Sequence, residues 1–197
     1  MRSLLWLCAL IFISSDIQAQ AWRLAKDDAG IKVYLKPIEG SSFQAFRATA
    51  HIRASLSDLL ALQDDVSSAC RWMHACQEQR LLKQQGQVSW IYSQYSAPWP
   101  VKPRDSVVRV DTAFKADGSV MRFLRAEADY LSAVPGFVRV SKVDGFWQLT
   151  PVEGGVDVVY QVYSDPGGSV PAWLANSFVV DAPFNTLNGL RQLAENP

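Results

Sequence analysis

The chain has 197 residues, a length that suits one domain with a large core or an enclosed cavity. Its 19 Lys and Arg residues balance its 19 Asp and Glu residues, so the formal net charge is zero. No basic run stands out, which argues against nucleic-acid binding driven by phosphate neutralisation. Aromatic residues make up 11% of the chain, enough to line an apolar pocket or to fill a compact core.

The first residues follow the pattern of a secretory signal peptide. Met1 and Arg2 form a short basic start, residues 4–13 are apolar, and Ala19-Gln20-Ala21 offers an A-x-A cleavage site. The apolar stretch is too short to span a bilayer, which needs about 20 residues. We therefore expect residues 1–21 to be removed and residues 22–197 to form one domain in the periplasm.

The start of the mature chain predicts two strands and a helix. Residues 31–38 and 43–52 alternate between apolar and polar side chains, the period of a half-buried strand. Ser55, with Asp58 three residues later, predicts the N-terminus of a helix that runs to about Val66.

Two cysteines, Cys70 and Cys76, remain in the mature chain. In an oxidising compartment a disulfide between them is favoured, and two free thiols are the alternative. The five residues between them match neither a zinc pattern nor a redox C-x-x-C motif, so we expect no metal site here.

The middle of the chain predicts an antiparallel meander. Turn residues such as Asp117-Gly118 and Gly154-Gly155 separate the apolar stretches, as hairpins require. We expect a break at Asp144-Gly145 inside the fifth strand. The predicted strands cover residues 77–83, 88–96, 106–114, 120–130, 137–149 and 156–164.

The last third of the chain predicts a long apolar helix. Gly167-Gly168 forms a turn, Ser169 is placed to cap the helix, and apolar residues continue to about Leu193. Its apolar surface is wider than one stripe, so the helix must cover other apolar groups, as a lid does. These elements predict an α+β helix-grip fold, a curved antiparallel sheet wrapped around a C-terminal helix. Such a sheet can pack solidly or enclose an apolar cavity.

Three segments carry a resemblance to a known family: residues 98–105 (PWPVKPRD), 136–140 (GFVRV) and 165–176 (DPGGSVPAWLAN). With these segments in this order, the chain resembles a bacterial member of the StAR-related lipid-transfer (START) family. The resemblance covers essentially the whole mature chain.

The resemblance implies a protein that holds one lipid in a closed tunnel between the sheet and the C-terminal helix. We expect this protein to be a monomer. The helix and a loop at residues 131–136 would open to admit the ligand, with transient membrane contact. Arg104 and Arg139 are the candidate polar anchors, although Arg104 paired with Asp105 is the structural alternative. The candidate wall residues are Trp90, Tyr92, Phe123, Tyr160 and Trp173. Trp173 and Phe178 are the candidate contacts of the helix that acts as a lid. The same strand faces, if they point outward, are ordinary solvated surface.

Two other classes of function stay open. Helix-grip relatives include enzymes, which need a positioned acid or base, and His51, His74, Glu127 and Asp129 are the candidates. No nucleophile elbow, metalloprotease motif or phosphate-binding loop is present in the sequence, so we expect binding without catalysis or a cofactor. A protein-interaction module would instead use a sheet edge or the apolar loop.

Overall fold

The computed structural model describes residues 21–168, 170 and 172–196, with the backbone alone for residues 172, 173, 175 and 177. The helices are α1 (Leu56–Asp64), α2 (Ala172–Glu195) and the 3-10 turns η1 (Val66–Arg71) and η2 (Ala128–Tyr130). The strands are β1 (Arg23–Asp28), β2 (Ile31–Pro37), β3 (Gln44–Ile52), β4 (Cys76–Gln85), β5 (Val88–Tyr95), β6 (Arg104–Phe114), β7 (Val120–Ala126), β8 (Val138–Arg139), β9 (Lys142–Val152) and β10 (Gly155–Asp165).

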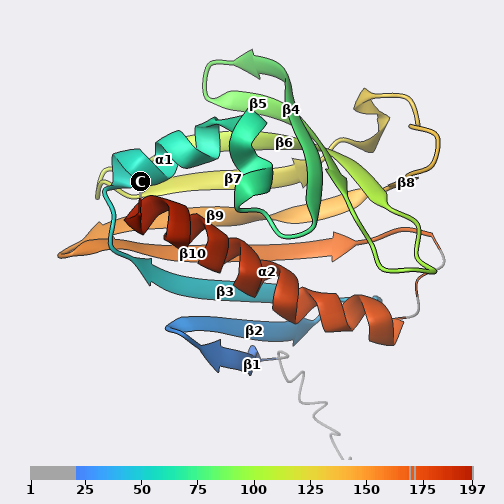
Figure 1. Cartoon of the computed structure of the whole chain (residues 1–197), viewed down its shortest axis with the longest axis horizontal. Helices are drawn as coiled ribbons and strands as arrows, with labels where there is room; N and C mark the ends of the chain where they lie inside the picture. The colour runs from blue at the N-terminus through green and yellow to red at the C-terminus, as the bar shows by residue number, and fades with distance from the viewer. Residues whose placement is uncertain (1–20, 169, 171, 197) are drawn as a thin grey trace, which may run out of the picture.

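All of these strands belong to one sheet. Nine follow the order β1-β2-β3-β10-β9-β7-β6-β5-β4 with antiparallel neighbours, and β8 pairs in parallel with β6. Helix α2 lies across one face of the sheet, which we call the inner face, and α1 lies beside the C-terminal end of α2 (Figure 1). The fold is therefore the predicted α+β helix-grip.

The C-terminal half of α2 packs into the main core. Leu187 and Leu190 are fully buried among side chains of the sheet, including Ile31 and Val33 of β2. Gly189 allows the helix to approach η1 closely, because a Cβ added there would lie 2.6 Å from the carbonyl oxygen of Trp72. This packing holds the C-terminal half of α2 against the sheet and places Trp72 in contact with α2 at Gly189.

Three expectations about the strands differ from the structure. The edge strand β1 was not predicted, because its residues carry little apolar periodicity. The strand expected over residues 120–130 ends at Ala126, where η2 begins after one residue. The break expected at Asp144-Gly145 lies instead at residues 140–141, between β8 and β9. Gly145 lies inside β9 and allows close packing against β10, because a Cβ there would lie 2.2 Å from the carbonyl oxygen of Gln161.

Residues 127–141, which we call the outer segment, cover part of the other face of the sheet. The backbone N–H of Glu127 donates to the carbonyl of Val107, and that of Val140 donates to the carbonyl of Asp105. As a result Asp105 is 1% exposed and Val107 is fully buried, although both lie on the face away from α2. This end of the sheet is therefore buried on both faces.

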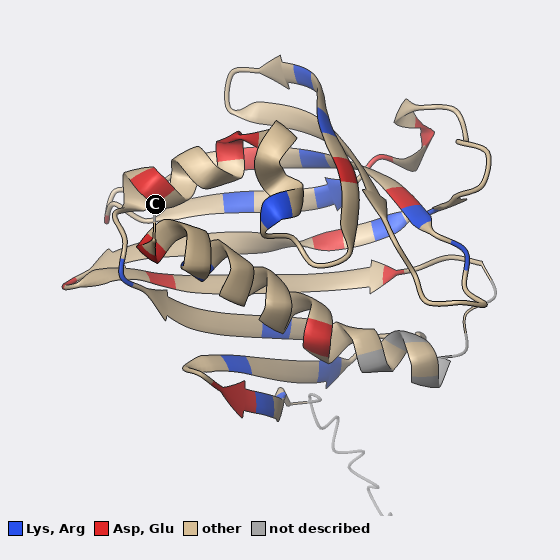
Figure 2. Cartoon of the chain, viewed as in Figure 1, with Lys and Arg blue, Asp and Glu red and all other residues tan. Residues whose placement is uncertain are grey.

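Positions occupied by Lys or Arg and by Asp or Glu are interspersed along the elements (Figure 2). Among the described residues, no helix combines the length and hydropathy needed to cross a membrane. The predicted cap Ser169 lies outside the described residues.

Candidate functional site

A cavity of about 780 Å³ lies between the inner face of the sheet and α2. This volume is within the range of small-molecule sites, roughly 300–1,000 Å³. The sheet side of the cavity is lined by residues of β3, β5, β6, β7, β9 and β10. The residues that follow η1 and the loop at residues 96–101 also line it. The wall is mostly apolar, with contributions that include Val108, Leu124, Val162, Phe178 and Val179.

A row of aromatic rings crosses the cavity wall. The rings of Trp147 and Tyr160 stack with centroids 3.8 Å apart, and Phe46 meets Tyr160 edge-on at 5.0 Å. Trp72 meets Trp147 edge-on at 6.2 Å, which extends the row from β3 to η1. Burial raises the pKa of Tyr160, so its hydroxyl stays neutral at physiological pH. The row supplies a rigid apolar surface, as the sequence predicted for Tyr160.

Arg104 is a buried cation on the cavity wall. It is 9% exposed and donates to the backbone carbonyls of Lys102, Pro166 and Gly167. Among the described residues, no carboxylate lies within salt-bridge distance of it. Burial accordingly lowers the pKa of its guanidinium. The pair with Asp105, the structural alternative, does not form, because adjacent residues of a strand point to opposite faces.

Arg139, the second predicted anchor, does not line the cavity. It lies on the outer face, where its Nε and Nη2 donate to the two carboxylate oxygens of Asp105 at 3.0 and 2.8 Å. Its Nη1 donates to the carbonyls of Ala128 and Leu131 at 2.6 and 2.8 Å. Hydrogen bonding to Asp105 raises the pKa of Arg139. Arg139 therefore ties the outer segment to β6.

Three predicted wall residues also lie on the outer face. Trp90 donates from Nε1 to Glu127 at 2.8 Å, and the guanidinium of Arg80 lies over the ring of Tyr92. Phe123 is 43% exposed. A period of two separates the faces of a strand but does not say which one points inward. The cavity faces of β5 and β7 instead carry Ile91, Ser93, Tyr95, Arg122 and Leu124.

The loop at residues 131–136 does not line the cavity either. It belongs to the outer segment, whereas Pro98 and Val101 of the loop at residues 96–101 reach the cavity wall. Phe178 lines the cavity and is 36% exposed, as a residue at its edge. The side chain of Trp173 lies outside the described residues.

The two histidines occupy different places. His74 lies on the cavity wall with its Nδ1 3.3 Å from the Nδ2 of Asn185. His51 lies at the surface, where its Nδ1 is 2.9 Å from Oδ1 of Asp157. No group of three or more His, Cys, Asp and Glu residues in the described part of the chain is arranged to hold a metal ion.

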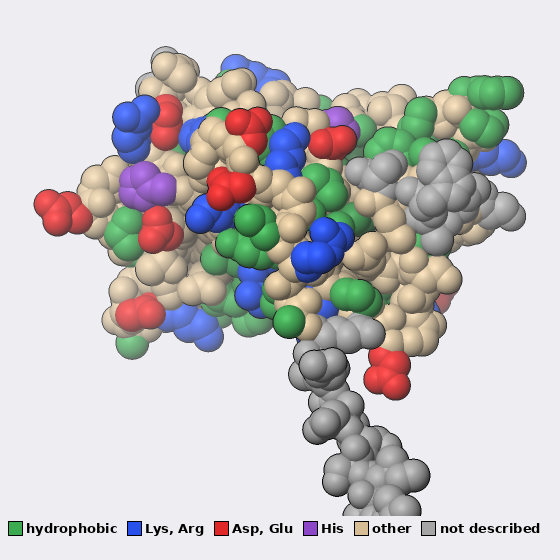
Figure 3. All heavy atoms as spheres, turned by 90° about the horizontal axis from the view of Figure 1, so that it is seen from below, with side chains coloured by type: hydrophobic (Ala, Val, Ile, Leu, Met, Phe, Trp, Pro, Cys, Tyr) green, Lys and Arg blue, Asp and Glu red, His purple; other side chains and the backbone are tan. Residues whose placement is uncertain are grey.

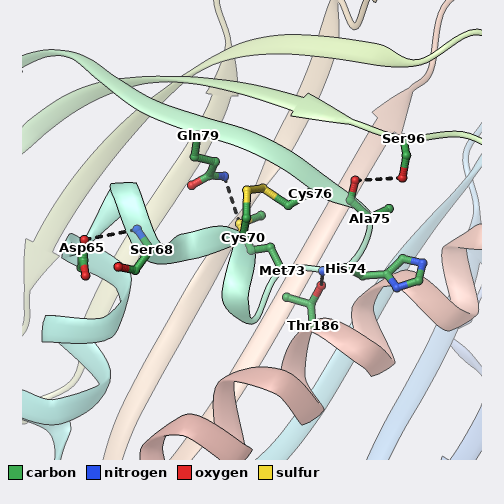
Figure 4. The surroundings of a disulfide bond; sticks show 10 residues. All are labelled: Asp65, Ser68, Cys70, Met73, His74, Ala75, Cys76, Gln79, Ser96 and Thr186. Atoms are coloured by element: carbon green, nitrogen blue, oxygen red, sulfur yellow. Dashed lines mark hydrogen bonds between the residues drawn. A yellow bond between two sulfur atoms is a disulfide. The ribbon is translucent and has the colours of Figure 1, made fainter.

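The predicted disulfide between Cys70 and Cys76 is confirmed, with an S–S distance of 2.03 Å. It joins the end of η1 to the start of β4, so it closes the loop that carries Trp72 and His74 to the cavity wall (Figure 4). The backbone N–H of His74 also donates to Oγ1 of Thr186 in α2 at 3.1 Å. The disulfide therefore fixes a loop that connects the wall to α2.

Replacing both cysteines by serine is expected to lower the free energy of unfolding by about 2 kcal/mol, because the unfolded chain gains the entropy of an open loop. Urea unfolding under non-reducing conditions measures the change. Adding a reductant to the wild-type protein should give a similar loss and should leave the double variant unaffected. An unchanged urea midpoint in the variant would contradict the expectation.

A curved antiparallel sheet that encloses an apolar cavity beneath a C-terminal helix defines a helix-grip protein with an internal cavity. No family model matches the chain. A solved StAR-related lipid transfer protein from Xanthomonas axonopodis is 39% identical with a TM-score of 0.84, covering 89% of this chain and 99% of that one. The chain belongs to the START family of lipid-transfer domains.

Two sequence relatives cover nearly the whole chain. An uncharacterized protein of Pseudomonas aeruginosa is 49% identical over 191 residues, which are 96% of this chain and 95% of that protein. The phosphatidylcholine transfer protein of Bos taurus is 23% identical over 186 residues, which are 91% of this chain and 87% of that protein.

Proposed function

We propose that the protein binds a single lipid in the cavity and serves lipid transfer or sensing in the periplasm. The observation that carries the proposal is the apolar cavity of about 780 Å³ with the buried cation Arg104 in its wall. The relatives named as lipid-transfer proteins support the same class of ligand. The cavity lies within one chain, so we also propose that the protein acts as a monomer.

Arg104 is the proposed anchor of an anionic head group. Its three hydrogen bonds go to neutral carbonyls, so its positive charge has no described counter-ion. A buried guanidinium without a counter-ion favours binding of a phosphate or carboxylate, to which it donates strong charge-assisted hydrogen bonds. The acyl chain of the ligand then extends along the apolar wall toward the aromatic row.

Membrane contact is proposed at the loop that lines the cavity edge. Trp99, between the wall residues Pro98 and Val101, is 93% exposed. Tryptophan is favoured where one end of a side chain is apolar and the other is wet, as at a membrane surface. Charged and apolar side chains are interspersed on the face seen in Figure 3. Because the formal net charge is zero, we expect contact through Trp99 without strong attraction to anionic lipids.

An enzyme that acts on a hydrophobic substrate is the alternative, and the observation that favours it is His74 in the cavity wall. An enzyme would convert an offered ligand to a product, and the conversion would be lost in His74→Ala. A carrier would return the ligand chemically unchanged.

Export to the periplasm is proposed from residues 1–21, with the disulfide as support, because disulfides persist in oxidising compartments. Cell fractionation and the intact mass of the mature protein test this proposal. A protein that begins at Trp22 in the periplasmic fraction is the expected result. A full-length protein in the cytoplasm would overturn it.

Native mass spectrometry of the protein purified from its own compartment tests the binding proposal. We expect one lipid per monomer, identified after organic extraction, and release of that lipid to acceptor vesicles. Arg104→Met should reduce the retained lipid, with the melting temperature as the control for folding. A protein that stays without lipid after incubation with a panel of lipids would overturn the proposal.

A further inference from the structure

The wall of the cavity has a second polar site, formed by Gln63, Trp72 and Arg122. Both amide atoms of Gln63, the Nε1 of Trp72 and the Nε of Arg122 are buried and make no hydrogen bond to any described residue. Trp72 and Arg122 are 7% and 8% exposed. A buried polar atom without a partner costs about 1–3 kcal/mol, so three such side chains on one wall need an explanation.

The fold brings these three side chains to the same place. Nη2 of Arg122 in β7 contacts Oδ1 of Asp64 at 2.7 Å, and Gln63 precedes Asp64 at the end of α1. Trp72 packs edge-on against Trp147, which is the cross-strand partner of Arg122. The end of α1, the residue after η1 and strand β7 therefore each contribute one member.

The charges of this site select the ligand group. Asp64 neutralises Arg122 from the solvent side, where the Asp64 side chain is 67% exposed. Gln63 and Trp72 are uncharged, so the site as a whole carries no net charge. Burying an anion beside a neutral ion pair requires its desolvation without a new counter-charge. The three donors suit an uncharged oxygen, and the Gln63 carbonyl can accept from a hydroxyl.

The site lies far from Arg104 along the same cavity. Arg122 pairs across strands with Thr112, eight residues along β6 from Arg104. At about 3.3 Å per residue, the backbones of Arg104 and Thr112 are about 26 Å apart along β6. The apolar side chains of Val108, Val110 and Leu124 line the wall between them, and the aromatic row crosses the sheet at the level of Arg122. One elongated ligand can therefore contact both polar groups.

We propose that Gln63, Trp72 and Arg122 form a second ligand site that binds an uncharged oxygen, a hydroxyl or carbonyl, at the far end of a lipid whose anionic group is held by Arg104. This inference rests on the proposed lipid-binding function. It assigns the ligand to a narrower class, lipids with a polar group remote from the head. Fatty acids and their ω-hydroxylated forms are matched probes, since they differ only in the remote oxygen.

Competition between two probes tests the assignment. The affinities of 16-hydroxyhexadecanoate and hexadecanoate are measured by displacement of a fluorescent fatty acid, in delipidated wild type, Gln63→Leu, Arg122→Met and Arg104→Met. We expect the wild type to bind the hydroxylated probe about tenfold more tightly, because one buried hydrogen bond is worth about 1.4 kcal/mol here. Gln63→Leu and Arg122→Met should remove that preference and keep the affinity for hexadecanoate.

Arg104→Met should weaken both probes by a similar factor, since both share the carboxylate. The ligand-free Gln63→Leu variant should have a urea midpoint at least as high as the wild type, because it removes buried atoms without partners. A wild type that binds both probes equally would overturn the second site and leave the proposed function intact, with ordered water as the partner of these atoms. A wild type that binds neither the two probes nor the fluorescent fatty acid would overturn the second site as assigned here, and the proposed function would fall with it only if the panel of lipids also left the protein empty.

Discussion

Replacing Arg139 by methionine is expected to lower the free energy of unfolding by about 3–5 kcal/mol, the largest stability effect in this chain that we can assign to one contact. The variant leaves the carboxylate of Asp105, 1% exposed, without its bidentate partner. It also removes the donor of the hydrogen bonds to the carbonyls of Ala128 and Leu131. Urea unfolding monitored by circular dichroism measures the loss.

Two controls separate this contact from a general effect of losing an arginine. Arg125→Met changes an exposed arginine of β7 and should alter stability by less than about 0.5 kcal/mol. Asp105→Asn combined with Arg139→Met removes both charges and should recover much of the loss. If Arg139→Met is as stable as wild type but fails to bind lipid, Arg139 is the anchor expected from the sequence and the structural role is wrong.

Replacing Val108 by tryptophan is expected to abolish ligand retention. Val108 lies on the cavity face of β6, so the added indole occupies space that the ligand needs. The loss of affinity should be at least tenfold, about 1.4 kcal/mol or more. The fold should persist, because the cavity accepts most of the added volume and overpacking costs about 1–3 kcal/mol. Native mass spectrometry after lipid loading measures the bound fraction.

Phe123→Trp is the matched control for this variant. It also introduces an indole into the central sheet, but on the outer face, where Phe123 is 43% exposed. Lipid loading should match the wild type. Equal loading of Val108→Trp and wild type would place the ligand outside this cavity.

The sequence was sufficient to predict most of the elements that build the fold. Alternating stretches, hairpin turns and a long apolar C-terminal segment correspond to β2 through β10 and α2. The edge strand β1 and the true end of β7 were not predicted. Strand β1 pairs with the adjacent β2 at the sheet edge, where it carries little apolar periodicity, and the end of β7 is set by the outer segment rather than by its own residues.

The candidate site was predictable only in part, because a strand pattern has two faces. Arg104, Tyr160 and Phe178 line the cavity as expected, whereas Trp90 and Phe123 lie opposite it. The face of β5 that carries Trp90 and Tyr92 has the composition of a pocket wall. The outer segment covers that face as well, so both faces of β5 carry apolar residues. The amino-acid composition of the strand therefore could not show which face lines the cavity.

The sequence by itself determined the family and the helix-grip architecture, since each depends on local patterns along the chain, and it favoured the cysteine pair over free thiols. Only the tertiary structure decided which face of each strand meets α2. It also paired Asp105 with Arg139 rather than Arg104, and brought Gln63, Trp72 and Arg122 from separate parts of the chain to one wall. The physical reason is that side-chain alternation and hydrogen-bond partners across the sheet are fixed by long-range pairing, which no local pattern records.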